Sequence, residues 1–195
     1  MSDKLSLMTS WSKERKLIAH QLVLFGVLLS LTGWRLLTDK WSLGMDVYKW
    51  WLGAMVGFLF VFSDRLVWAF WQKPEETLAV KMRELFAGGK LLEGLVLTLE
   101  ERREQKKMMI RSVLFLVIWV VLTILVLTST VKSFPRGFML GMGLHLGFDL
   151  ISDYLGKGRD VKWWMWQVKG EWGDREIDWL VWGYMFFLIV LGLSL

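Results

Sequence analysis

The hydrophobic residues of this chain gather in five long runs that are separated by charged segments. A helix needs about 20 apolar residues to cross the roughly 30 Å hydrocarbon core of a bilayer. Three of the runs reach this length almost without charge, and a fourth is apolar in outline but carries polar side chains. The fifth is interrupted by Asp64 and Arg65, and it crosses only if this pair lies at membrane depth. The predicted spans are 17–37, 48–71, 110–131, 137–155 and 177–195.

Lysine and arginine lie mainly on one side of this arrangement. With five spans and a cytoplasmic N-terminus, the cytoplasmic segments hold 18 of the 24 Lys and Arg residues, five lie on the other side, and Arg65 lies within a span. This bias follows the positive-inside rule. The pattern predicts an all-α, polytopic integral membrane protein with its N-terminus in the cytoplasm. We expect it in the plasma (inner) membrane of a prokaryote.

The composition narrows the functional classes. The chain has no cysteine, which excludes disulfides, thiolate nucleophiles and metal sites built on cysteine. Its net charge of +5 comes from clusters between apolar runs, which is typical of membrane orientation and not of nucleic-acid binding. Fourteen tryptophans fit a protein that meets the interface between lipid and water. The lipid bilayer is therefore the first expected partner.

The longest cytoplasmic segment, 74–109, predicts a helical hairpin. Pro74 followed by two glutamates is a favourable helix start, and Gly88–Gly89 marks the break between two helices. The apolar faces of both helices need a cover, which could be each other, the lipid surface, or a membrane or cytoplasmic protein partner. On the second helix the residues expected to bind such a partner are Leu92, Leu95 and Leu99.

The second cytoplasmic segment, 156–176, is rich in tryptophan among basic residues. Such segments can stack on single-stranded nucleic acid, but beside a membrane they are expected to anchor in the headgroup region. We therefore interpret this segment as an interfacial loop. The alternation of Val161, Trp163 and Met165 would also fit a short strand or hairpin.

A stripe of small and ionisable residues follows the fourth span at intervals of four. Each such step turns a helix about 40° beyond a full turn, so His145, Asp149 and Asp153 share one face. Ionisable groups in a span are costly and face the protein interior or a wet cavity. Small residues let neighbouring helices approach closely. The glycines expected at helix contacts are Gly53, Gly57, Gly137 and Gly141, and on the opposite side of the fourth span Gly143 and Gly147.

Several polar residues should lie at similar depth near the inner side of the membrane. Together they would form a pocket open to the cytoplasm, composed of His20, Asp64, Arg65, His145, Asp149 and Asp153. A divalent metal could bind there, above all at His145, Asp149 and Asp153, and the same groups could serve acid–base chemistry.

A structural role for these residues is the alternative. His145 and Asp149 lie one turn apart and could satisfy each other, while Asp153 could pair with Lys157 on the next turn. Asp64 and Arg65 could likewise pair with other helices.

One stretch resembles a known motif. The sequence from Gly143 to Leu150 contains His-Leu-x-x-Asp, and the segment Trp163–Trp166 follows it. A His-Leu-x-x-Asp helix followed by a Trp-bearing turn resembles a motif of the LexA-binding, inner-membrane-associated metal-dependent hydrolase family. The resemblance covers residues 143–166 and implies that His145 and Asp149 are metal-site positions. The family's other polar motifs, near its N-terminus, have no counterpart in this chain.

Three classes of function fit these patterns. The first is a non-catalytic subunit, scaffold or assembly factor that acts through the 74–109 hairpin. The second is a metal-dependent membrane hydrolase with its His/Asp site at the inner leaflet. The third is a small transporter or channel subunit, acting as a homo-oligomer, that uses the stripe on the fourth span. No nucleotide-binding loop, Ser-His-Asp order or paired zinc-helix motif supports a further enzyme class.

Overall fold

The structure is a computed structural model that describes residues 21–38, 44–90, 93–94, 97, 107–156 and 160–194. Within these ranges every regular element is a helix. Two of the helices are not of the α type: η1 is a π-helix and η2 is a 3₁₀ helix. In chain order the elements are Gln21–Leu37, α2 Met45–Phe60, α3 Ser63–Val67, η1 Trp68–Gln72, α4 Thr77–Ala87, α6 Val113–Thr128, α7 Ser133–Leu155, η2 Asp160–Met165 and α8 Asp174–Ser194.

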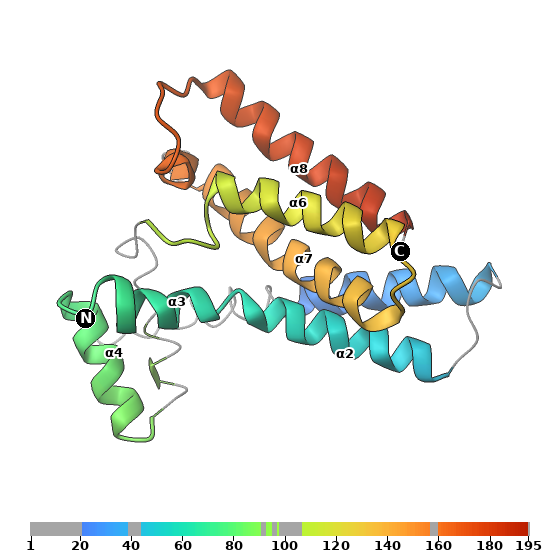
Figure 1. Ribbon diagram of the computed structural model, residues 1–195, viewed down its shortest axis with the longest axis horizontal. Coiled ribbons are helices and arrows are strands. Elements are labelled where there is room, and N and C mark those ends of the chain that lie inside the picture. Colours follow the sequence, from blue (N-terminus) through green and yellow to red (C-terminus); the bar gives the residue numbers. More distant parts are fainter. Residues whose placement is uncertain are drawn as a thin grey trace, which may run out of the picture.

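Helix α7 is the centre of the molecule. It packs against α2 on one side and against α6 and α8 on the other (Figure 1). An almost unbroken run of its residues, from Met139 to Gly147, is buried. The helix Gln21–Leu37 joins the bundle at its edge, where Thr32 accepts a hydrogen bond from Trp51 of α2 (3.0 Å) and Leu31 approaches Gly192 of α8.

The surface of the molecule is unusually apolar for a water-soluble domain. Large apolar side chains are exposed along α6, for example Leu114 and Leu125, and along α8, for example Trp179 and Phe186. The interior is a hydrophobic core that also contains several ionisable side chains, among them Asp64, Arg65, Arg111, His145 and Asp149. Contiguous apolar surfaces of this extent mark a face that meets lipid or another protein.

Among the described residues, two helical stretches are long and apolar enough to span a membrane. They are Met45–Gln72, in which α2, α3 and η1 follow one another, and Asp174–Ser194. Two shorter helices, Gln21–Leu37 and Val113–Thr128, are also apolar. The elements therefore lie where the five hydrophobic runs were predicted, although only two of them meet the length and composition of a span.

The third predicted span, 110–131, is too long. The helix α6 occupies Val113–Thr128, and it begins at Ser112, whose side chain accepts a hydrogen bond from the Phe115 amide. Residues 109–111 are not helical, because their amides bond to the carboxylate of Asp64 instead of to the preceding turn. Apolar composition alone does not reveal where a side chain replaces the helical hydrogen bonds of the backbone.

The first helix of the predicted hairpin, α4, lies at the end of the long α2–η1 stretch, away from the bundle (Figure 1). Its apolar face packs on η1, so that Leu78, Ala79 and Met82 are buried together with Trp68 and Met108. This face is therefore covered by the chain itself. The second helix is described only at Glu93, Gly94 and Leu97. The predicted partner-binding residues Leu92, Leu95 and Leu99 lie outside the described residues.

The segment predicted as an interfacial loop is more ordered and more buried than expected. Residues Asp160–Met165 form the 3₁₀ helix η2, so the predicted alternative of a strand is wrong. Val161 and Trp164 are fully buried, whereas Trp166 is exposed. Trp164 is held inside because its indole nitrogen Nε1 donates a hydrogen bond to Asp153 Oδ2 (2.9 Å) at the end of α7. At this tryptophan, the predicted anchoring in the headgroup region is wrong.

Candidate functional site: a buried ionic cluster at one end of the bundle

Glycines bring α2 and α7 into backbone contact. A Cβ atom added to Gly137 would overlap the carbonyl oxygen of Trp50, and one added to Gly141 would overlap that of Ala54. Gly53 and Gly57 on α2 lie equally close to the backbone of α7 at residues 134 and 138. The four glycines expected on this ridge therefore lie in one helix contact. The close approach places the following turns of α7 directly beside the end of α2.

Two further glycines admit α6 and α8 on the other side of α7. A Cβ atom at Gly143 would overlap the ring of Trp119, and one at Gly147 would press on Leu188 and Tyr184. The two large side chains are also hydrogen bonded to α7: Trp119 Nε1 donates to the Met139 carbonyl (3.1 Å), and the Tyr184 hydroxyl donates to the Gly143 carbonyl (3.0 Å). Rotation of α7 in the bundle is thereby fixed from both sides.

His145 points from α7 toward the end of α2. Its Nδ1 lies 2.7 Å from the carbonyl oxygen of Phe58, and because this oxygen can only accept, Nδ1 carries a hydrogen and donates it. The ring is fully buried between the rings of Phe58 and Phe62, at centroid distances of 4.6 and 4.7 Å. The other nitrogen, Nε2, lies 3.5 Å from Asp149 Oδ2. The imidazole is thus hydrogen bonded to a backbone carbonyl and lies beside a carboxylate.

Asp149 lies one turn further along α7 and binds a cation from another part of the chain. Its Oδ2 is 2.5 Å from Arg111 Nη2, and both side chains are almost completely buried. Arg111 directly precedes α6, and its Nη1 also approaches the Met108 sulfur (3.8 Å). A charge-assisted pair in a water-excluded site is strong, but it requires that both charges stay paired.

Asp64 on α3 lies on the other side of the same segment. Its Oδ1 accepts a hydrogen bond from the Met109 amide (3.1 Å), and its Oδ2 accepts from the amides of Ile110 (2.9 Å) and Arg111 (3.3 Å). This carboxylate thereby satisfies three consecutive amides that have no helical partner. Buried amides need such partners, above all where water is excluded. Asp64 and Asp149 thus bind the same segment: Asp64 binds the backbone amides of residues 109–111, and Asp149 binds the side chain of Arg111.

The other described members of the predicted pocket have different neighbours. Arg65 is buried with its guanidinium over the Phe62 ring, 5.3 Å from the centroid. Asp153 accepts a hydrogen bond from the Trp164 indole. His20 and Lys157 lie outside the described residues, so the predicted contribution of His20 and the predicted Asp153–Lys157 pair cannot be placed.

The described residues do not assemble the predicted metal site. Within the ranges that the structure describes, no three His, Asp or Glu side chains come close enough together to hold a metal ion. Asp149 faces the cation of Arg111, and Asp153 is taken by a tryptophan one turn away. The His–Asp contact predicted as the structural alternative is present between His145 and Asp149.

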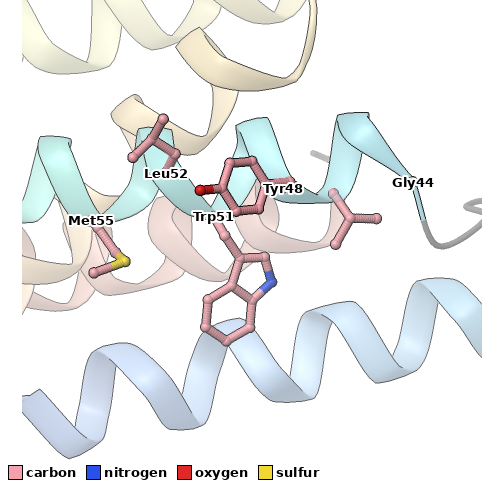
Figure 2. A pocket seen from close by; sticks show the side chains of 6 residues that line it. Gly44, Tyr48, Trp51, Leu52 and Met55 are labelled. Carbon is pink, nitrogen blue, oxygen red and sulfur yellow. The ribbon is translucent and has the colours of Figure 1, made fainter.

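A groove on the N-terminal half of α2 has a different chemistry. Its volume is about 440 Å³, and it is lined by Gly44, Val47, Tyr48, Trp51, Leu52 and Met55. Trp51 points toward the helix Gln21–Leu37 (Figure 2), where its indole donates to Thr32. The Tyr48 hydroxyl and the Trp51 indole are the polar side-chain groups among these lining residues, so the groove is suited to apolar groups.

Arg111 is the central residue that the sequence did not single out. It was counted with the cytoplasmic cations, because it stands at the boundary between the charged segment and an apolar run. A signal was present, since carboxylates at 64 and 149 were predicted at the depth of this boundary. A cation between two such carboxylates could have been proposed as their shared partner.

Comparison of the chain with protein-family models, with curated proteins and with solved structures finds no match.

Proposed function

We propose that this chain is a five-helix integral membrane protein whose N-terminus lies in the cytoplasm. The apolar surface supports this, because lipid is the solvent that suits the exposed apolar faces of α2, α6 and α8. Four described helices besides α7 are apolar, two of them at full spanning length. The 18-to-5 distribution of Lys and Arg supports the direction of insertion.

Within the membrane we propose a non-catalytic role as a subunit, scaffold or assembly factor. The observation that carries this proposal is that the ionisable groups of the fourth span bind groups of the same chain. His145 bonds to the Phe58 carbonyl, and Asp149 pairs with Arg111. A catalytic or transport site needs polar groups that are offered to a substrate or ion, whereas these side chains fix helices to each other.

The cytoplasmic hairpin is the proposed contact with a partner protein. The face of α4 that contains Leu78 and Met82 is covered by η1, so it is not offered to a partner. The second helix of the hairpin carries the apolar residues Leu92, Leu95 and Leu99, and these are the proposed binding residues. A few apolar anchors of this kind carry most of the free energy of a protein interface.

Chemical crosslinking in native membranes followed by affinity purification tests this role. We expect a partner protein that is recovered with the natural chain and at least about tenfold less with the double variant Leu92→Ser, Leu95→Ser, because buried anchors each contribute 1–2 kcal/mol or more. The matched control, Lys81→Ala with Glu84→Ala, alters exposed residues of α4 in the same hairpin and should keep the partner.

The opposite outcome supports the hydrolase alternative. In that case the hairpin variants would leave recovery unchanged, and the purified protein would contain a bound divalent metal that is lost in His145→Ala and Asp149→Ala.

A further inference from the structure

The described residues form two separate hydrophobic cores. The larger core belongs to the bundle; along the chain it reaches Val61 and resumes at Ile110. The smaller core lies between η1 and α4 and includes Met108. Between the two lies α3, whose buried residues are the charged Asp64 and Arg65. At this junction the two cores are therefore joined largely through polar groups.

The chain also changes its helical geometry at this junction. The amides of Phe62, Asp64 and Arg65 bond to the carbonyls three residues back, at 3.0, 3.3 and 3.1 Å, so the turn after α2 is of the 3₁₀ type. Shortly after it the Lys73 amide bonds to the Trp68 carbonyl (2.8 Å), five residues back, in the π-helix η1. Short 3₁₀ and π segments inside a longer helix often mark a hinge or functional position.

We propose that Asp64, Arg111 and Asp149 form a latch, which fixes the orientation of the α4 unit (α3, η1, α4 and Met108) on the bundle across a hinge at Val61–Phe62. The same short segment of chain is bound from both sides. Asp64 of the α4 unit holds its amides, and Asp149 of the bundle holds the Arg111 side chain. Both contacts involve an ionised group, so they are stronger than neutral hydrogen bonds.

Another hydrogen bond between described residues crosses the junction near the latch. The Trp166 indole, which follows η2, donates to the Met108 carbonyl (3.1 Å). A single neutral bond contributes less than the charged contacts. We therefore assign the orientation of the α4 unit mainly to the latch. Release of the latch would change how the hairpin is presented; this consequence rests on the proposed function, whereas the latch is a property of the chain alone.

Distance measurements between two spin labels test the latch. The chain has no cysteine, so labels can be attached after Lys81→Cys on α4 and Leu155→Cys on α7, both at exposed positions. In lipid nanodiscs we expect one narrow distance distribution. Asp64→Asn should broaden or shift it, because asparagine has a single acceptor oxygen and cannot receive three amides on two oxygens. Asp149→Asn should do the same by removing the charge that holds Arg111.

Asp153→Asn is the matched control, since the carboxylate that it removes lies at the same end of α7 and binds Trp164. We expect it to keep the narrow distribution. The latch is overturned if both latch variants are folded and retain the distribution of the parent protein, or if Asp153→Asn broadens it equally. Because these readouts need no partner, failure to find one would reject the proposed function and leave the latch standing.

Hydrogen exchange of the natural chain decides the question if the latch variants do not fold. The amides of residues 109–111 should exchange together and much more slowly than unstructured amides, by at least about tenfold, as expected for charge-assisted hydrogen bonds in a buried site. Exchange of these three amides at the rate of an unstructured chain would overturn the proposal.

Discussion

At the scale of single residues, the central observation is that two buried carboxylates bind different kinds of group. Asp64 binds three backbone amides, whereas Asp149 contacts side chains. The difference follows from what each one faces. Asp64 meets a non-helical stretch whose amides lack partners, and Asp149 meets a guanidinium and an imidazole. Because the site is buried, each carboxylate stays favourable only while its partners remain in place.

Asp149→Asn should therefore lower the stability of the folded protein markedly. It removes the negative charge that pairs with the buried Arg111, and loss of one partner of a buried ion pair typically costs about 3–5 kcal/mol. The free energy of unfolding can be followed in mild detergent by the fluorescence of the fourteen tryptophans. Asp153→Asn is the control and should cost less, about 1–2 kcal/mol, because the amide oxygen of asparagine can still accept the hydrogen bond from Trp164. Equal losses in the two variants would contradict the structural role of the Arg111–Asp149 pair.

At the scale of helices, the contact between α2 and α7 sets the position of the cluster. Glycines on both helices allow backbone contact, which a hydrophobic core of larger side chains would not permit. The contact places α7 so that His145 reaches the carbonyl of Phe58, near the point where α2 ends. The glycine ridge and the ionic cluster therefore depend on each other. Close packing at the glycines sets the distance between α2 and α7, and this distance lets His145 reach the Phe58 carbonyl.

Gly141→Ala should separate α2 from α7 and destabilise the protein. The added methyl group would meet the backbone of Ala54, which cannot move aside as a side chain can, and overpacking of this kind costs about 1–3 kcal/mol or more. Gly183→Ala on α8 is the control, since nothing lies within 4 Å of its added Cβ. There alanine should be neutral or stabilising by up to about 1 kcal/mol, because it favours the helix. Thermal unfolding in detergent measures both; an unaffected Gly141→Ala variant would argue against the helix contact.

At the scale of the whole molecule, the surface is apolar like the core. The exposed faces of α2, α6 and α8 are apolar, while buried charged groups join one end of the bundle to the α4 unit. Such a molecule suits a solvent that is itself apolar. The polar groups inside then act through directional bonds, because lipid offers no hydrophobic driving force for one helix to seek another.

Single cysteines should report opposite sides of the membrane in intact cells. With a chain that has no cysteine of its own, a membrane-impermeant maleimide should label Lys132→Cys, between α6 and α7, without treatment. It should label Lys90→Cys, after α4, only when the membrane is opened. This follows if α6 crosses from inside to outside. The unaltered chain is the control for background. Labelling of both positions from the same side would reject the proposed topology.

The positions of the helices and of the glycine ridge could be read from the amino-acid sequence. Both are local patterns: apolar runs define helices by length, and intervals of four place Gly137 and Gly141 on one face whatever surrounds them. Asp64 and Asp149 were predicted at similar depth for the same reason, because rise per residue converts position in a helix to height.

Only the tertiary structure decided which groups these residues bind. The partners of Asp64 are amides of an irregular stretch, the partner of Asp149 comes from the start of another helix, and Trp164 enters the interior to reach Asp153. Such choices depend on how each helix is rotated and on where its backbone departs from regularity. Neither the rotation of a helix nor an irregular backbone produces a periodic pattern in the sequence, since contacts between distant segments depend on the packing of the whole chain. The position of a residue along its helix can therefore be predicted from the sequence, whereas its binding partners are determined by the tertiary structure.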